Sequence, residues 1–388
     1  MKIAFIGQKG IPGKSGGIEK HVEHLSVGLV KRGHEVIVFT RSHYTPATEV
    51  TYKGVTLVNL PSAATKNLDA ISHTFFAIIY LLRHDVDIIH FHGIGPSSLI
   101  WLAKLLKPKT KVMATFHCQD YFHKKWGSLA KMYLKFGERV ACTISDMVIT
   151  VSLTLQKYVD DTYKRSSVYI PNGVLPSVYE PVDEIQQWGL EKGNYILAVS
   201  RLIPHKGIEL LLRAFATTGT DKKLVVVGGG AFTDDYVQKL NLLAADDSRV
   251  IMVGEQRGKV LRELFSNALF FVQPSESEGL SIALLEAMSY GKTALISDIP
   301  ENKEAIGDHG FSFKNKNQED LSQKISLLVS SEEILSIKGI AAQKRTIDFY
   351  NWEEIIKNTE DLYENVLLQD FSKKIEGMKF ASRVGSFL

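Results

Sequence analysis

Short apolar runs alternate with segments of helical periodicity along most of this chain, and this alternation constrains its fold more than any other feature. The first series contains "KIAFIG", "HEVIVFT", "DIIHFHG" and "KVMATFH". The second contains "YILAVS", "KLVVVGGG", "RVIMVG", "LFFVQPS" and "KTALIS". Strands that are apolar throughout and separated by helices indicate parallel sheets covered on both faces.

The two series predict two α/β domains. At 388 residues the chain exceeds the size at which a single core usually stops growing. The proline-punctuated segment "IPNGVLPSVYEPV" separates the series, so we expect one domain over residues 1–173 and another over 178–351. Both should be Rossmann-like, doubly wound domains facing each other across a cleft. Ligands of such sheets bind beyond the carboxyl ends of the strands.

The charge of the chain is unevenly distributed. Residues 1–170 contain 22 Lys and Arg against 12 Asp and Glu, whereas the remainder contains 24 against 31. A basic half favours an anionic partner such as nucleic acid, anionic lipid or a phosphorylated substrate. No nucleic-acid recognition motif accompanies this charge. Two cysteines, an N-terminus without signal-peptide features and no long apolar segment predict a cytoplasmic protein that does not cross a membrane.

The segment "PSESEGLSIALLEAM" carries the first candidate site. It predicts a strand-to-helix junction at Glu278, Gly279 and Leu280. Free amides and the dipole at a helix N-terminus bind phosphate, and a glycine lets the backbone come close. Glu286 lies two turns on and on the same face, where its carboxylate could accept both hydroxyls of a ribose. Alternatively, Glu278 is a dipole partner of the helix and Glu286 an ordinary surface residue.

Two cations favour the phosphate interpretation. Arg201 and Lys206, in "SRLIPHKG", follow the first strand of the second series. Two positive charges in such a turn can neutralise a diphosphate and stabilise the charge that grows on it as a leaving group. Taken alone, they would more often be solvated surface charges.

Four motifs in this order resemble the retaining nucleotide-sugar glycosyltransferases of the GT-B architecture, in particular glycosyltransferase family 4. The most specific is the glutamate pair in "EGLSIALLEAM"; the others are "SRLIPHKG", "PNGV" and "GGIEKHV". The resemblance covers most of the chain. It implies a GT-B fold whose last helix, within residues 352–388, packs back on the N-terminal domain. It also implies transfer of a sugar from a nucleoside diphosphate, with UDP or GDP expected, to an acceptor hydroxyl.

The resemblance assigns donor-site roles in the second domain. Arg201 and Lys206 would hold the diphosphate, Glu278 would touch hydroxyls of the donor sugar, and Glu286 would bind the ribose. The diphosphate cradle would consist of the amides of Gly279, Leu280 and Ser281. Contacts to the base are expected near Gly254.

Further roles fall on the first domain and the linker. Gly16 and Gly17 would close over the donor phosphate, and Asn172 would also contact the donor. His117, after the strand "KVMATF", would lie near the donor sugar and the acceptor. The implied catalytic set is therefore His117, Arg201, Lys206 and Glu278.

No metal or cofactor is expected. The pair Asp85 and Asp87 precedes a strand instead of following one, which favours turn chemistry over a metal-binding Asp-x-Asp. His90 and His92 share one face of a strand, but no third ligand has a fixed spacing to them. Diphosphate would instead be bound by Arg, Lys and amides. The resemblance also implies that the leaving phosphate helps to take the acceptor's proton.

Other classes remain as alternatives. A phosphorylase or a sugar-nucleotide epimerase could use the same architecture, and a sugar-nucleotide-binding protein could lack catalysis. The glycines of "GQKGIPGKSGG" do not fit G-x-G-x-x-G, and the second strand lacks the expected acidic residue, so a dehydrogenase is disfavoured.

A basic helix in the first half suggests a membrane surface. Lys124, Lys131, Lys135 and Arg139 recur at helical spacing beside the apolar positions Leu129, Met132, Phe136 and Val140. The pattern fits either an amphipathic helix packed on the core or a helix lying on anionic lipid, with each basic residue contributing about 1 kcal/mol. The second possibility suits an acceptor carried on a lipid, such as an intermediate of cell-surface polysaccharide synthesis.

Overall fold

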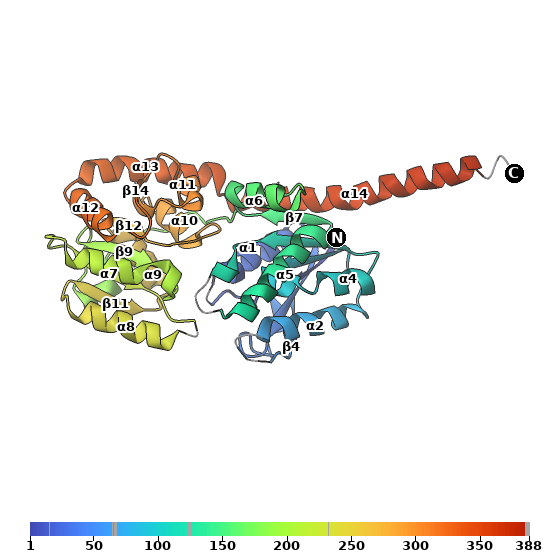
Figure 1. Cartoon of the computed structure of the whole chain (residues 1–388), viewed down its shortest axis with the longest axis horizontal. Helices are drawn as coiled ribbons and strands as arrows, with labels where there is room; N and C mark the ends of the chain where they lie inside the picture. Colours follow the sequence, from blue (N-terminus) through green and yellow to red (C-terminus); the bar gives the residue numbers. More distant parts are fainter. Residues whose placement is uncertain (15, 64, 66–67, 123–125, 232, 385–388) are drawn as a thin grey trace.

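The computed structural model describes residues 1–14, 16–63, 65, 68–122, 126–231 and 233–384, with side chains described as far as residue 368. Two α/β domains lie beside each other (Figure 1). The apolar runs of the sequence are strands in both domains, and each domain has its own sheet.

The N-terminal sheet has eight strands in the order β3-β4-β2-β1-β5-β6-β7-β8. Its strands are β1 (Lys2–Ile6), β2 (Glu35–Arg41), β3 (Thr51–Tyr52), β4 (Val55–Leu60), β5 (Ile88–His92), β6 (Lys111–Phe116), β7 (Met147–Thr150) and β8 (Val168–Tyr169). All pairs are parallel except the edge pair β3 and β4. Asp85 and Asp87 precede β5, and Asp87 accepts a hydrogen bond from the Lys2 amide, as expected of turn residues.

Helices cover both faces of this sheet. They are α1 (Gly17–Lys31), α2 (Asp69–Leu81), α3 (Ile94–Ser97), α4 (Ile100–Leu106), α5 (Ser128–Ile144) and α6 (Leu153–Tyr163), with a short 3-10 turn, η1 (Asp120–Phe122). Buried residues of α2, α4 and α5 share one apolar cluster with β1, β2, β5 and β6. Residues of α1 form the core on the opposite face.

The C-terminal sheet is parallel throughout, with the order β11-β10-β9-β12-β13-β14. Its strands are β9 (Tyr195–Val199), β10 (Lys223–Val227), β11 (Val250–Gly254), β12 (Phe270–Gln273), β13 (Ala294–Ser297) and β14 (Phe311–Phe313). Its helices are η2 (Glu184–Trp188), η3 (Pro204–Lys206), α7 (Ile208–Ala216), α8 (Asp234–Ala245), α9 (Gly258–Asn267), α10 (Ile282–Ser289), α11 (Pro300–Ile306), α12 (Gln318–Leu328) and α13 (Glu332–Phe349).

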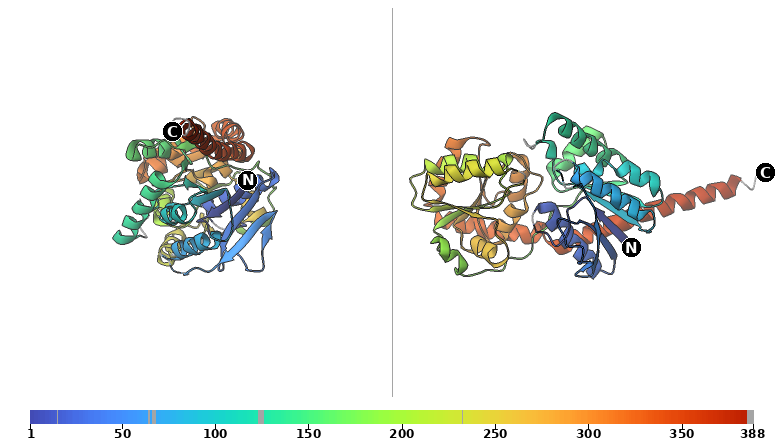
Figure 2. Two further views of the ribbon diagram at one scale, coloured as in Figure 1. Left: turned by 90° about the vertical axis from the view of Figure 1, so that its right-hand side faces the viewer. Right: turned by 90° about the horizontal axis from the view of Figure 1, so that it is seen from below.

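The last helix, α14 (Trp352–Val384), leaves the C-terminal domain and runs along α1 of the N-terminal domain (Figures 1 and 2). Its Glu360 carboxylate pairs with Arg32 and His34, and Ile356 packs where a side chain on Gly28 would otherwise lie. The Tyr363 hydroxyl reaches His90 in the middle of the sheet. The first and last parts of the chain therefore share one core.

Candidate functional site

The carboxyl ends of strands from the two domains face each other, so the loops after them meet. A Cβ on Gly279, which follows β12, would lie 1.6 Å from the backbone oxygen of His117, which follows β6. A Cβ on Gly17, at the start of α1, would touch Ile282 of α10 at 3.4 Å. Both glycines lie at contacts between the domains, and Gly279 leaves no room for a side chain.

Helix α10, whose start was predicted to bind phosphate, begins later in the chain than the sequence indicated. The sequence placed the helix start at Glu278 to Leu280, but α10 begins at Ile282, and the N-cap is Ser281. Gly279 and Leu280 are therefore loop residues, because the Ser281 hydroxyl caps the Leu284 amide and bonds Gln273 at the end of β12. Within the described part of the chain, the amides of Gly279, Leu280 and Ser281 donate no hydrogen bond, so all three can bind an anion.

The two predicted cations lie beside this loop. Lys206 Nζ pairs with Glu278 Oε1 at 2.5 Å, and these side chains are only 13% and 8% exposed. Arg201 follows β9 and is exposed. The pKa of Cys118 is raised well above its usual value, mainly by burial and by Asp120, whereas Arg201 and Lys206 act in the opposite direction. Both cations therefore lie near Cys118, next to His117, on the facing domain.

Glu286 also contacts the other domain. Its Oε1 lies 2.6 Å from Lys20 Nζ of α1, and the two side chains are 23% and 35% exposed. The carboxylate that was expected to bind a ribose therefore lies at the domain interface and is paired with the Lys20 ammonium group. Its second oxygen has no bond among the described residues.

The remaining predicted residues lie at the same edges. Asn172 is buried, and its side-chain nitrogen donates to the Leu280 oxygen, which ties the linker to the loop before α10. Gly16 is the N-cap of α1, with a φ of 95° that favours glycine. Gly254 ends β11 with a φ of 69° and is exposed, with open space where a Cβ would lie.

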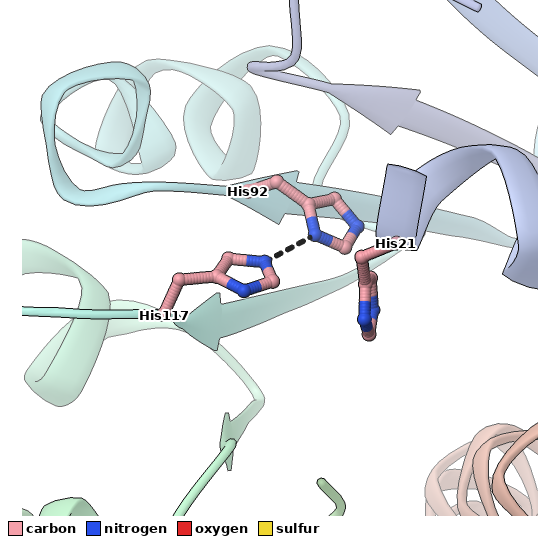
Figure 3. Close-up of side chains that lie close together, drawn as sticks. All are labelled: His21, His92 and His117. Atoms are coloured by element: carbon pink, nitrogen blue, oxygen red, sulfur yellow. Dashed lines mark hydrogen bonds between the residues drawn. The ribbon is translucent and has the colours of Figure 1, made fainter. Parts of the chain in front are cut away.

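Behind His117 lies a group of buried imidazoles that the sequence did not predict as a unit (Figure 3). His92 Nδ1 and His117 Nε2 are hydrogen-bonded at 3.0 Å, and His21 of α1 packs edge-on against His117 at 5.0 Å. Burial lowers the pKa of His21 to about 4 and the pKa values of His92 and His117 well below their usual range. These rings are therefore neutral at pH 7. The His117 ring points into this group, while its backbone oxygen faces Gly279.

Among the described residues, the same three imidazoles form the group that could hold a metal ion. One ring nitrogen from each of His21, His92 and His117 lies within 4.8 Å of the others. The sequence had left His92 without a third ligand, and the fold supplies one through α1. No carboxylate belongs to this group, and the bond between His92 and His117 accounts for their spacing. We therefore interpret the group as a neutral, hydrogen-bonded wall of the site.

The basic helix predicted near residue 130 is α5, which packs on the core through Leu134, Val140 and Ala141 but not along the whole predicted apolar stripe. Val140 is buried, but Leu129, Met132 and Phe136 are 76%, 65% and 49% exposed, so this stripe does not pack on the core. Lys131, Lys135 and Arg139 lie on the same helix. Lys124 lies outside the described residues.

Sequence reasoning missed Lys20 and His21, although both belong to the motif "GGIEKHV". Positions 17, 20, 21 and 24 share one face of a helix. Because Gly17 was expected to face the other domain, residues 20, 21 and 24 could have been expected to face it too. It also missed Glu304 of α11, whose carboxylate accepts from the amides of Leu153 and Thr154 at the start of α6.

Two family models match the chain, one for each domain. The model described as Glycosyltransferase Family 4 matches residues 15–177, and the model described as Glycosyl transferases group 1 matches residues 183–345. The two α/β domains have the GT-B architecture, as the sequence predicted. The chain belongs to glycosyltransferase family 4 and is a glycosyltransferase.

Relatives and solved structures agree with this assignment. The phosphatidylinositol N-acetylglucosaminyltransferase gpi3 subunit of Schizosaccharomyces pombe is 26% identical, over 94% of this chain and 81% of the relative. The N-acetyl-alpha-D-glucosaminyl L-malate synthase of Bacillus anthracis is 26% identical, over 76% and 78%. Sucrose-phosphate synthase from Thermosynechococcus elongatus has a TM-score of 0.81 at 20% identity, over 95% and 99%. Anabaena HepE, solved with UDP and glucose, has a TM-score of 0.78 at 18% identity, over 94% and 100%.

Proposed function

We propose that this protein transfers a sugar, with retention of anomeric configuration and without a metal ion, from a UDP- or GDP-sugar to an acceptor hydroxyl. The observation that carries the proposal is the convergence of three unbonded amides with the largely buried ion pair of Lys206 and Glu278 at the domain interface. Anabaena HepE, with the same fold, was solved with UDP and with UDP-glucose.

The donor would lie between the start of α10 and the cations. Its diphosphate would accept from the amides of Gly279, Leu280 and Ser281, which the α10 dipole supports. Arg201 and Lys206 would neutralise the diphosphate and stabilise the charge that develops on it as the leaving group. Glu278 would then share Lys206 and accept from hydroxyls of the sugar, and Glu286 would accept from the ribose.

Transfer would take place on one face of the sugar. The bond between the anomeric carbon and the diphosphate oxygen breaks while the acceptor oxygen forms its bond from the same side. The departing phosphate oxygen takes the acceptor's proton, which requires no protein carboxylate as nucleophile. His117, neutral at pH 7, bonds His92 through Nε2, so its Nδ1 would be the ring nitrogen that hydrogen-bonds the sugar or the acceptor.

We also propose that the acceptor is a lipid-linked glycan of cell-surface polysaccharide synthesis, reached by a cytoplasmic protein at the inner face of the membrane. The relative from Schizosaccharomyces pombe is named for transfer to phosphatidylinositol, whereas the relative from Bacillus anthracis is named as an N-acetyl-alpha-D-glucosaminyl L-malate synthase, with malate in place of a lipid. The exposed basic residues of α5 favour the lipid-linked class. Among the described residues, no helix is both long and apolar enough to traverse a bilayer.

A thermal-shift screen of nucleoside diphosphates and sugar nucleotides with a metal chelator tests the donor site. A ligand at about 100 times its dissociation constant should add about 2.7 kcal/mol to stability. Glu286→Ala and Arg201→Ala should abolish the shift, whereas Arg213→Ala, on an exposed face of α7, should keep it. A shift that requires Mg²⁺, or that survives both substitutions, would contradict the proposed site. Sugar turnover that requires inorganic phosphate would indicate a phosphorylase, and an altered donor sugar without acceptor an epimerase.

A further inference from the structure

Helices α2, α4 and α5 form one layer on the N-terminal sheet. Their inward residues belong to the same apolar cluster, with Ile78 from α2, Ile100 from α4 and Ala141 from α5. Helix α5 contacts both α3 and α4, and α2 contacts α3. The outward sides of the three helices therefore make up a single side of the domain, opposite α1 and α14.

This outward side, here called the α2–α4–α5 face, is unusually apolar. Nine large apolar residues on it or at its helix ends are at least 40% exposed: Phe75, Phe76, Ile79, Leu82, Trp101, Leu105, Leu129, Met132 and Phe136. On the opposite side, α1 contributes no exposed large apolar residue, and Leu368 is the one from the described part of α14. A soluble surface scatters such residues singly, whereas a gathered set marks a binding surface.

The charge of the α2–α4–α5 face is mainly positive. Its three helices contain two carboxylates, of which Glu138 is buried and Asp69 is paired with Arg41. Lys131, Lys135 and Arg139 lie on α5, and exposed Arg83 follows α2. Lys104 of α4 pairs with Asp146, which follows α5, and Asp85 pairs with Lys107. Basic side chains beside protruding aromatic and aliphatic ones suit an anionic lipid surface, where the apolar groups enter the bilayer and the cations meet the phosphates.

We propose that the α2–α4–α5 face docks on an anionic lipid bilayer by inserting its apolar side chains. The proposal deepens the proposed function and rests on its lipid-linked acceptor, but it concerns a surface of three helices instead of the basic side of α5 alone. The two modes of membrane binding also respond differently to salt. Binding by inserted apolar side chains persists in high salt, whereas binding by the attraction of lysines to anionic lipid is screened.

The face adjoins the site through the segment after β6. That segment carries His117 and continues into η1, which packs on α5. Lys135 lies over the buried Tyr121 ring at 5.3 Å, and the neighbouring Phe122 is 56% exposed. A bilayer on α5 therefore meets the same loop that contacts Gly279, so the head group of a lipid-linked acceptor has a short path to the donor.

Co-sedimentation of the full chain with vesicles tests the docking without donor or acceptor. Vesicles of phosphatidylglycerol and phosphatidylcholine should bind the wild type at both about 0.1 M and about 1 M salt, where the Debye length falls from about 10 to about 3 Å. The triple variants Phe75→Ser/Phe76→Ser/Ile79→Ser and Leu129→Ser/Met132→Ser/Phe136→Ser should each lower the partition coefficient on the order of 100-fold. All six side chains are exposed, so both variants should melt as the wild type does.

A matched control uses α13, which also exposes isoleucines but belongs to the other domain. Ile337→Ser/Ile340→Ser, at positions 60% and 66% exposed, should bind vesicles like the wild type. Loss of wild-type binding in high salt, equal loss in the α13 variant, or binding unchanged in both triple variants would overturn the proposal. A wild-type dimer that the triple variants convert to monomers would overturn it too, since the face would then join two copies. The nucleoside-diphosphate thermal shift of the same variants reports separately on the donor site.

Discussion

Lys20 Nζ of α1 lies 2.6 Å from Glu286 Oε1 of α10, so one ion pair joins the two domains through the carboxylate expected to bind ribose. The two residues are 266 positions apart in the chain. If both oxygens of Glu286 bind a ribose, as proposed, Lys20 must release Oε1 when the donor enters.

Lys20→Met should therefore tighten the binding of a nucleoside diphosphate. A partly exposed ion pair contributes about 0 to 1 kcal/mol, so the dissociation constant should fall by a factor of up to about five. Titration calorimetry measures it, and the wild type should approach the variant in high salt. Lys31→Met, at the far end of α1, is the control. Weaker binding in Lys20→Met would show instead that Lys20 itself holds the donor.

Gly279→Ala should disable the enzyme by keeping the domains apart. The added Cβ would lie 1.6 Å from the His117 oxygen, so the loop or the domain must move. Overpacking of this kind costs about 1 to 3 kcal/mol of stability. We expect kcat/KM to fall at least about 100-fold, since misplacement by about 1 Å has that effect. Gly219→Ala, with open space around its Cβ, should retain activity; an active Gly279→Ala enzyme would refute the close approach.

Glu304→Ala should loosen the contact between α11 and α6. The Glu304 carboxylate accepts from the amides of Leu153 and Thr154, so it caps a helix of the other domain. Loss of a cap costs about 0.5 to 2 kcal/mol, which urea unfolding can measure. Glu304→Gln keeps an acceptor and should recover part of the loss. Equal stability of Glu304→Ala and the exposed Glu333→Ala would rule out the cap.

His73→Leu should reduce the acid sensitivity of folding. Burial, assisted by Arg41, lowers the pKa of His73 from its usual 6.5 to about 4. Between these pH values the unfolded chain binds a proton that the folded chain does not, so stability falls as pH falls. From pH 7.5 to about 5.5 the wild type should lose about 1.4 kcal/mol more than the variant in chemical unfolding. His309→Leu should retain the wild-type loss, and an identical slope in both variants would contradict the buried neutral state.

Much of the fold could be predicted because its signals are local. Continuous apolar strands and interleaved helices predicted two doubly wound domains, and the family models and structural neighbours confirm the GT-B architecture. The predicted start of α10 was wrong because Ser281 bonds Gln273 and caps the helix itself. Hydrophobic periodicity does not reveal which of several neighbouring residues is the N-cap. The roles assigned to Arg201, Glu278 and Glu286 stay predictions.

The sequence alone determined the elements, the domain order and the loops at which chemistry was expected, since each depends on residues within a few turns of one another. Only the tertiary structure decided what those elements face. Periodicity showed that α5 has an apolar side, but only the fold left Leu129, Met132 and Phe136 in solvent. Likewise, His21, His92 and His117 come from separate segments and meet because the carboxyl ends of β5 and β6 adjoin the start of α1. Contacts between distant segments depend on packing, which local patterns do not encode.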